Sequence, residues 1–165
     1  MVSYLEKCFR RYKRLNKKIT QLKEGPNTPS IRAGDVICIY GDTGPVYGVV
    51  TEEGVVKNCI LLSPELFLAG DGLLLRVEHL VNLLRVTPIN FYLTPNMYKA
   101  CEPIGKLKQE DLARVVENFQ NLRQKHWSGV RRKFFEYEMK RIEILYNAFL
   151  EFLRQVEWET QGSSN

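Results

Sequence analysis

The stretch "IRAGDVICIYGDTGPVYGVVTEEG", residues 31–54, decides the fold. It contains two short runs rich in β-branched and aromatic residues, "DVICIY" and "PVYGVVT", separated by the turn formers "GDTG". Strand runs joined by such tight turns are typical of antiparallel sheets. The stretch therefore predicts the first two strands of a small barrel or rolled sheet.

The same pattern continues downstream of this hairpin. "VVKNCILL" and "GLLLRV" predict further strands, with "EEG" and "AGDG" as turns. "SPELFLAG" fits either a strand with a loop or a single helical turn, and "EHLVNLLRV" fits a helix or a strand. "INFYLTPNMY" is expected to close the sheet, with Pro95 ending the strand. Residues 31–105 are thus predicted to form one antiparallel β-barrel-like domain.

Both flanks of this domain show helical periodicity. Before it, residues 1–25 predict an amphipathic helix that ends at Gly25-Pro26, and residues 26–30 predict a linker. After it, residues 106–160 predict a C-terminal helical segment with a break or bend at Ser128-Gly129, followed by a disordered tail at 161–165. The N-terminal apolar stripe consists of Val2, Leu5, Phe9, Tyr12, Leu15, Ile19 and Leu22. The expected fold class is α+β, a small barrel flanked by helices.

Composition and cysteine use narrow the class of protein. No apolar run approaches the roughly 20 residues that a membrane-spanning helix needs, and the start of the chain lacks the features of a signal peptide. We therefore expect a cytoplasmic protein without a membrane partner. The four cysteines form no C-x-x-C pair, and only two histidines accompany them. Buried free thiols are expected, with no metal site and no cofactor.

Positive charge is concentrated at the N-terminus. The chain carries a net charge of +5, whereas residues 1–25 alone hold eight Lys/Arg against two Glu. The cations opposite the apolar stripe suit a phosphate backbone. Two other interpretations stay open, a solvated face on a protein-contacting helix and a helix lying on anionic lipid. The predicted nucleic-acid-binding residues of this face are Lys7, Arg10, Arg11, Arg14, Lys17 and Lys18.

A second cluster of cations surrounds a tryptophan near the predicted bend. Aromatic rings combined with cations often hold single-stranded nucleic acid. Trp127 could equally be a core anchor at a helix corner. The candidate residues of this cluster are Lys125, Trp127, Arg131, Arg132 and Lys133.

Two parts of the chain resemble a known family. "GDVICIYG" followed by "GPVYGVV", and the later stretch from "EHLVNLLRV" to "LARVVENF", resemble plasmid-maintenance toxins of the PemK/MazF type over about residues 33–119. The step Ile104-Gly105-Lys106-Leu107, followed by "KQEDLARVV", is similar to the family's transition into its C-terminal helix. The resemblance implies an SH3-like barrel that dimerises and cleaves single-stranded RNA without a metal.

The catalytic pattern of that family is not reproduced. Its members usually carry an arginine just before the proline that opens the second strand, and this chain has Gly44-Pro45 there. Metal-free RNA cleavage needs an acid, a base and a cation at the phosphate. Five residues could fill these catalytic roles, although their spacing does not demand it: Asp42, Thr43, Ser63, Arg76 and Arg85.

Three functional hypotheses follow. The first is nucleic-acid binding, to RNA more than DNA, by a catalytically diverged toxin-like scaffold. The second is a non-enzymatic protein-interaction or assembly factor that acts through its C-terminal helices. The third is a metal-independent endoribonuclease toxin. A homo-oligomer is expected in each case, because the apolar stripes exceed what a barrel of this size can cover.

Overall fold

Six antiparallel strands form one sheet in the computed structural model, which describes residues 30–77 and 83–162, with residue 99 and residues 151–162 as backbone only. The sheet order is β4-β5-β3-β2-β1-β6. The strands are β1 (Asp35–Gly41), β2 (Gly44–Val50), β3 (Lys57–Ser63), β4 (Leu74–Leu75), β5 (Leu84–Leu93) and β6 (Cys101–Lys106). The predicted α+β class is confirmed. The predicted N-terminal helix and nearly all of the linker lie outside the described residues.

The opening hairpin is closed by a two-residue loop. Gly41 pairs with Gly44, so that Asp42 and Thr43 alone connect β1 to β2. Gly44 has a φ of 101°, a conformation that L side chains rarely adopt. This conformation explains why a glycine stands directly before Pro45.

The sheet curls into a half-barrel. A Cβ on Gly105 in edge strand β6 would lie 2.6 Å from the Val77 side chain, which follows the opposite edge strand β4. Within the sheet, a Cβ on Gly48 would lie 2.5 Å from the ring of Phe91. The two edges of the sheet therefore approach each other, and one strand lies directly against an aromatic ring.

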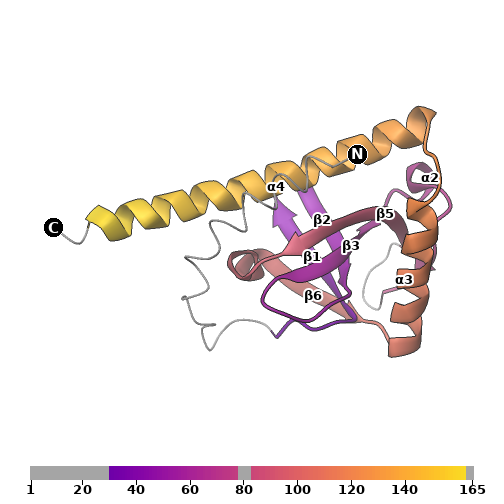
Figure 1. Cartoon of the computed structure of the whole chain (residues 1–165), viewed down its shortest axis with the longest axis horizontal. Coiled ribbons are helices and arrows are strands. Elements are labelled where there is room, and N and C mark those ends of the chain that lie inside the picture. Colours follow the sequence, from indigo (N-terminus) through magenta and orange to yellow (C-terminus); the bar gives the residue numbers. More distant parts are fainter. Residues whose placement is uncertain (1–29, 78–82, 163–165) are drawn as a thin grey trace.

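Both faces of the sheet are buried, which explains the nearly continuous apolar runs in the sequence. Ile37, Leu61 and Phe91 belong to one core, whereas Val36, Ile60 and Val86 belong to the other. Two helices complete these cores, α3 (Gln109–Arg123) on one face and α4 (Gly129–Gly162) on the other (Figure 1). The apolar residues of α3 that are buried are Val115, Phe119 and Leu122.

Several details decide between the alternatives that the sequence left open. "SPELFLAG" contains a single helical turn, α2 (Leu66–Ala69). "INFYLTPNMY" contains the end of β5 and the start of the 3-10 helix η1 (Pro95–Ala100). The predicted break is confirmed, because α4 starts at Gly129 with a φ of 64°. α4 continues to Gly162, so the first two residues of the expected tail are helical.

The three cysteines that the structure describes are free and buried, as expected: Cys38, Cys59 and Cys101. Burial raises the pKa of the Cys101 thiol to about 12, with smaller contributions from Cys38 and Asp35. Within the described ranges, no helix combines the length and the apolar character needed to cross a bilayer.

Candidate pocket and nucleic-acid interface

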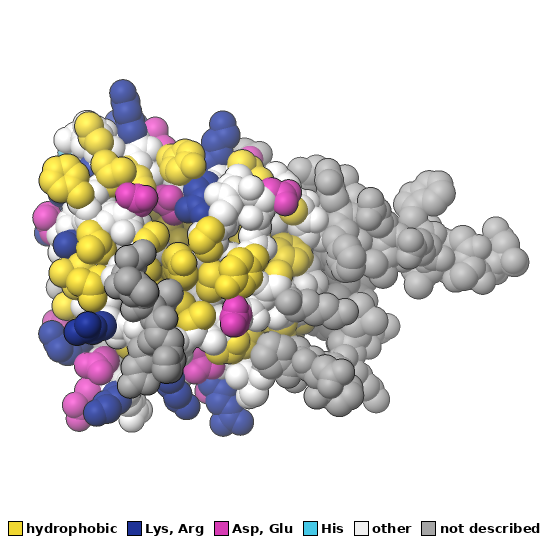
Figure 2. All heavy atoms as spheres, turned by 180° about the vertical axis from the view of Figure 1, so that it is seen from behind, with side chains coloured by type: hydrophobic (Ala, Val, Ile, Leu, Met, Phe, Trp, Pro, Cys, Tyr) yellow, Lys and Arg dark blue, Asp and Glu magenta, His cyan; other side chains and the backbone are white. Residues whose placement is uncertain are grey.

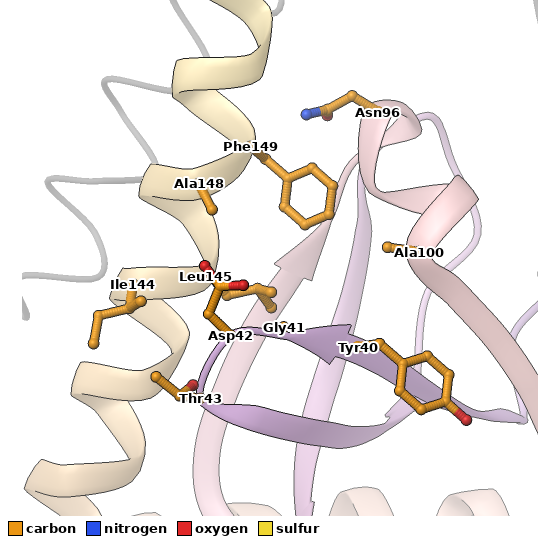
Figure 3. A pocket seen from close by; sticks show the side chains of 10 residues that line it. All are labelled: Tyr40, Gly41, Asp42, Thr43, Asn96, Ala100, Ile144, Leu145, Ala148 and Phe149. Carbon is orange, nitrogen blue, oxygen red and sulfur yellow. The ribbon is translucent and has the colours of Figure 1, made fainter.

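A cavity of about 400 Å³ lies between the β1–β2 turn, η1 and α4 (Figure 3). The turn contributes Asp42 and Thr43, and α4 contributes apolar side chains that form one wall. The complete lining is Tyr40, Gly41, Asp42, Thr43, Asn96, Ala100, Ile144, Leu145, Ala148 and Phe149. A mainly apolar hollow with a few polar groups is the usual character of a binding site.

Two polar side chains mark the edge of this cavity. The Nδ2 atom of Asn96 is buried and has no hydrogen-bond partner among the described residues. Tyr40 is 60% exposed and donates its hydroxyl to Oε2 of Glu102 at 3.0 Å. This hydrogen bond, with a further electrostatic contribution from Cys38, raises the pKa of Tyr40 to about 12. The hydroxyl of Tyr40 is thus occupied by Glu102, and the Nδ2 atom of Asn96 is a buried donor without a partner among the described residues.

A buried ion pair fixes α4 to the hairpin beside the cavity. Nη1 of Arg141 donates to both carboxylate oxygens of Glu138 at 3.0 Å, and Nη2 donates to the carbonyl oxygen of Pro45 at 2.7 Å. The two charged side chains are only 13% and 6% exposed. The turn that carries Asp42 and Thr43 is therefore held by α4 as well as by its own strands.

The five catalytic candidates separate into different places. Asp42 and Thr43 lie together at the cavity, whereas the hydroxyl of Ser63 is buried and accepts a hydrogen bond from the backbone N–H of Glu65 at 3.1 Å. Arg85 lies opposite Ser63 on β5 and donates to the carbonyl oxygen of Gly72 at 2.9 Å.

The remaining candidate, Arg76, is exposed and does not line the cavity. Two strands, β2 and β3, separate the end of β1 from β5, which corresponds to about 14 Å at the usual strand spacing. The described residues therefore do not bring an acid, a base and a cation of this set to one point. They also contain no group of three or more His, Cys, Asp or Glu that could hold a metal ion.

Trp127 is a packing residue. It lies against both hydrophobic cores, and its ring meets Phe135 edge-on at a centroid distance of 5.0 Å. The guanidinium group of Arg131 stands over the indole at 5.6 Å. Both contacts fit the interpretation of Trp127 as a core anchor.

Two of the four cations in the second cluster are paired. Arg131 contacts Asp71 at 3.2 Å, and Arg132 contacts Glu136 at 3.1 Å along α4. Lys125 and Lys133 are exposed and form no ion pair within the described part of the chain. Figure 2 shows hydrophobic side chains in a broad band across one face, with cations and carboxylates mixed around it. The described part of this face therefore carries no surface of a single sign.

The six cations of the N-terminal segment, Lys7, Arg10, Arg11, Arg14, Lys17 and Lys18, lie outside the described residues. Sequence reasoning missed Asn96, Glu138 and Arg141. Asn96 has a weak signal, since it follows Pro95 at the end of a predicted strand. Arg141 and Glu138 have none, because charged residues occur all around the α4 sequence.

Comparison with models of known protein families found no match, and comparison with curated proteins found none either.

Proposed function

We propose that this protein binds nucleic acid, RNA in preference to DNA, through the cationic side of residues 1–25. The single observation that supports the proposal is the segregation of charge. The first 25 residues carry eight Lys/Arg and two Glu, whereas the whole chain has a net charge of only +5. A contiguous run of cations attracts a polyphosphate and releases its counterions. The sheet and its helices act as the scaffold.

The finer assignment of this scaffold belongs to the same proposal. We assign the scaffold to SH3-like barrels related to the PemK/MazF-type toxins, and the curled antiparallel sheet supports this assignment. Gly44 stands where the family usually has its arginine, which supports catalytic divergence. The preference for RNA rests on this resemblance. A cytoplasmic location, expected from the sequence, belongs to the same proposal.

A charge-reversal variant tests the proposal. Arg10, Arg11, Arg14, Lys17 and Lys18 are all replaced by Glu, and the affinity for a single-stranded RNA is measured at several salt concentrations. We expect the affinity to fall at least tenfold. The slope of log K against log salt should become shallower by about 0.7 for each phosphate that the variant no longer neutralises.

The matched control reverses five exposed cations elsewhere. Lys106, Lys108, Arg114, Arg123 and Lys140 are replaced by Glu, so that the net charge changes by the same amount. The control should keep most of the RNA affinity. An equal loss in both variants would show an effect of net charge alone, and unchanged binding in the first variant would exclude the proposed interface.

Protein recognition is a second candidate function, favoured by the cavity and the unpartnered Nδ2 atom of Asn96. Ala148 lines the cavity and is exposed, so Ala148→Trp fills the space without disturbing a core. This variant should abolish a partner complex and leave RNA affinity unchanged. Leu145 is unsuitable for the test, because it is only 4% exposed and belongs to the core.

Metal-independent RNA cleavage is the third hypothesis, and a separate assay tests it. RNA is incubated with the protein in the presence of EDTA, with Asp42→Ala and Thr43→Ala as comparison variants. If the wild-type protein cleaves RNA and these variants do not, the protein is a ribonuclease and the first proposal is replaced.

A further inference from the structure

The cavity between the β1–β2 turn, η1 and α4 carries negative charge. Of the described residues that line it, none is Lys, Arg or His, and Asp42 contributes a carboxylate that forms no ion pair with any described residue. A second carboxylate, that of Glu102, accepts the hydroxyl hydrogen of Tyr40 at the edge of the cavity. The cation beside the hairpin, Arg141, is already neutralised by Glu138. The cavity therefore attracts a positively charged group rather than a phosphate.

The wall that α4 gives the cavity is apolar and includes an aromatic ring. Phe149 is half-buried and lines the cavity together with Ala148 and Leu145 (Figure 3). The face of an aromatic ring attracts a cation, and an apolar wall suits the methylene stem that carries one. A guanidinium group is planar, weakly hydrated and able to donate two parallel hydrogen bonds to a carboxylate, unlike the compact ammonium group of lysine. An arginine side chain therefore fits both this wall and the carboxylate of Asp42.

The amide of Asn96 adds a requirement that a cation alone does not meet. Its Oδ1 atom accepts a hydrogen bond from Oγ1 of Thr94 at 2.6 Å, whereas its Nδ2 atom is buried and has no partner among the described residues. A buried donor without a partner costs free energy, and a guanidinium group offers no acceptor to relieve it. A main-chain carbonyl oxygen does offer one. The ligand that satisfies the cavity thus carries a cation and a carbonyl group, as an arginine within a peptide does.

The size and layout of the cavity agree with such a ligand. Its volume of about 400 Å³ lies at the lower end of the range of about 300–1,000 Å³ for ligand pockets, which suits one side chain with its main chain. In Figure 3 the amide of Asn96 lies above the ring of Phe149 and the carboxylate of Asp42 lies below it. The acceptor and the cation of the ligand are therefore required at different ends of the cavity.

We propose that the cavity receives an arginine side chain of a partner protein. Its guanidinium group binds the carboxylate of Asp42, its stem lies along Phe149 and Ala148, and a main-chain carbonyl oxygen of the same segment accepts a hydrogen bond from Nδ2 of Asn96. This inference rests on protein recognition, the second candidate function, and names the residue that anchors the partner. It does not depend on RNA binding.

An NMR titration of the isotope-labelled full chain tests the proposal with the tripeptide acetyl-Gly-Arg-Gly-amide. We expect saturable shifts of the side-chain amide of Asn96 and of the backbone amides of Thr43 and Ala148. The same tripeptide with citrulline, which replaces the guanidinium by a neutral urea of similar shape, should bind about tenfold more weakly. The lysine tripeptide should bind about threefold more weakly. Agmatine, which has the guanidinium but no main-chain carbonyl, should also lose about threefold.

Two variants locate the binding at the carboxylate. Asp42→Asn removes the charge and keeps a residue that suits the two-residue hairpin loop, so the affinity for the arginine tripeptide should fall about tenfold. As the matched control, Glu117→Gln removes the same charge from the exposed side of α3, on the other face of the sheet, and should leave the affinity unchanged. Unchanged sheet amides in both variants report that the protein is folded.

Four results would overturn the proposal. Absence of shifts at Asn96, Thr43 and Ala148 would show that the cavity does not bind the tripeptide, and equal binding of the citrulline or lysine tripeptide would show that arginine is not recognised. Equal binding of agmatine would assign the cavity to a free small cation instead of a protein. An unchanged affinity in Asp42→Asn would show that this carboxylate makes no contact.

Failure of this proposal is distinguishable from failure of the functions proposed above. If Ala148→Trp abolishes a partner complex but no arginine tripeptide binds, protein recognition stands and the arginine anchor is wrong. The RNA-binding test changes only residues 10–18, none of which lines the cavity, so its outcome is independent of the tripeptide titration.

Discussion

Trp127 illustrates how one residue type admits two opposite roles. Its surroundings in the sequence, cations on both sides, are those of a nucleic-acid platform, but its ring contacts Phe135 edge-on and lies under the guanidinium group of Arg131. The distinguishing information is the position of the two cores, whose residues come from distant parts of the chain. No local pattern could have supplied it.

Trp127→Ala should therefore act on stability. Removing a largely enclosed indole should lower the free energy of unfolding by about 3 kcal/mol. Urea denaturation measures this change, with RNA affinity measured under native conditions as the comparison. A stable variant that has lost RNA affinity would contradict the packing role and restore Trp127 as a stacking residue.

Tyr40 gives a second prediction at the scale of one residue. Its hydrogen bond to Glu102 raises the pKa of Tyr40 from 10.0 to about 12. Because the folded pKa is the higher one, the contribution of Tyr40 to stability is complete below pH 10 and is lost as the pH rises from 10 to 12.

Alkaline absorbance titration measures this ionisation as the difference between the wild type and Tyr40→Phe. Glu102→Gln should bring the pKa of Tyr40 back toward its ordinary value. A pKa that stays near 12 in this variant would assign the shift to something other than the carboxylate.

At the scale of elements, α4 and the β1–β2 hairpin are joined by Arg141 and Glu138. Arg141→Met leaves the Glu138 carboxylate buried without its cation, and we expect a loss of about 3 kcal/mol in the free energy of unfolding. The double variant Glu138→Gln with Arg141→Met should recover most of that loss, because no unpaired charge remains.

A double-mutant cycle by urea denaturation measures the coupling between the two residues. Additive effects of the two substitutions would show that the ion pair does not join α4 to the hairpin.

The elements that were predictable from sequence are those with strong local patterns. The β1–β2 hairpin, the buried side of α3 and the break before Gly129 all follow from turn formers or from 3.6-residue spacing. β6 was not predicted as a separate strand, since Pro103 interrupts it and such a strand is acceptable only at a sheet edge. The cavity was also beyond prediction, because its walls come from three elements that only the fold brings together.

At the scale of the whole molecule, α4 divides into a part that belongs to the core and a part that extends beyond it. Deleting residues 151–165 should leave the thermal unfolding of the sheet close to that of the full chain, because the C-terminal part of α4 extends past the sheet (Figure 1). Deleting residues 143–165 should abolish cooperative unfolding, since it removes Leu145 and Tyr146.

Differential scanning calorimetry on the two truncated chains measures both outcomes. A large drop in melting temperature for the shorter deletion would mean that the extended part of α4 belongs to the cooperative unit.

The position of α4 after all six strands has a consequence for biosynthesis. One face of the sheet is covered by a helix that the ribosome makes only after every strand. Until α4 has been synthesised, Phe91, Ile37 and their neighbours lack this cover, and the nascent chain exposes an apolar surface. Messages truncated before the α4 codons would consequently yield products prone to chaperone capture and degradation, even though all six strands are encoded.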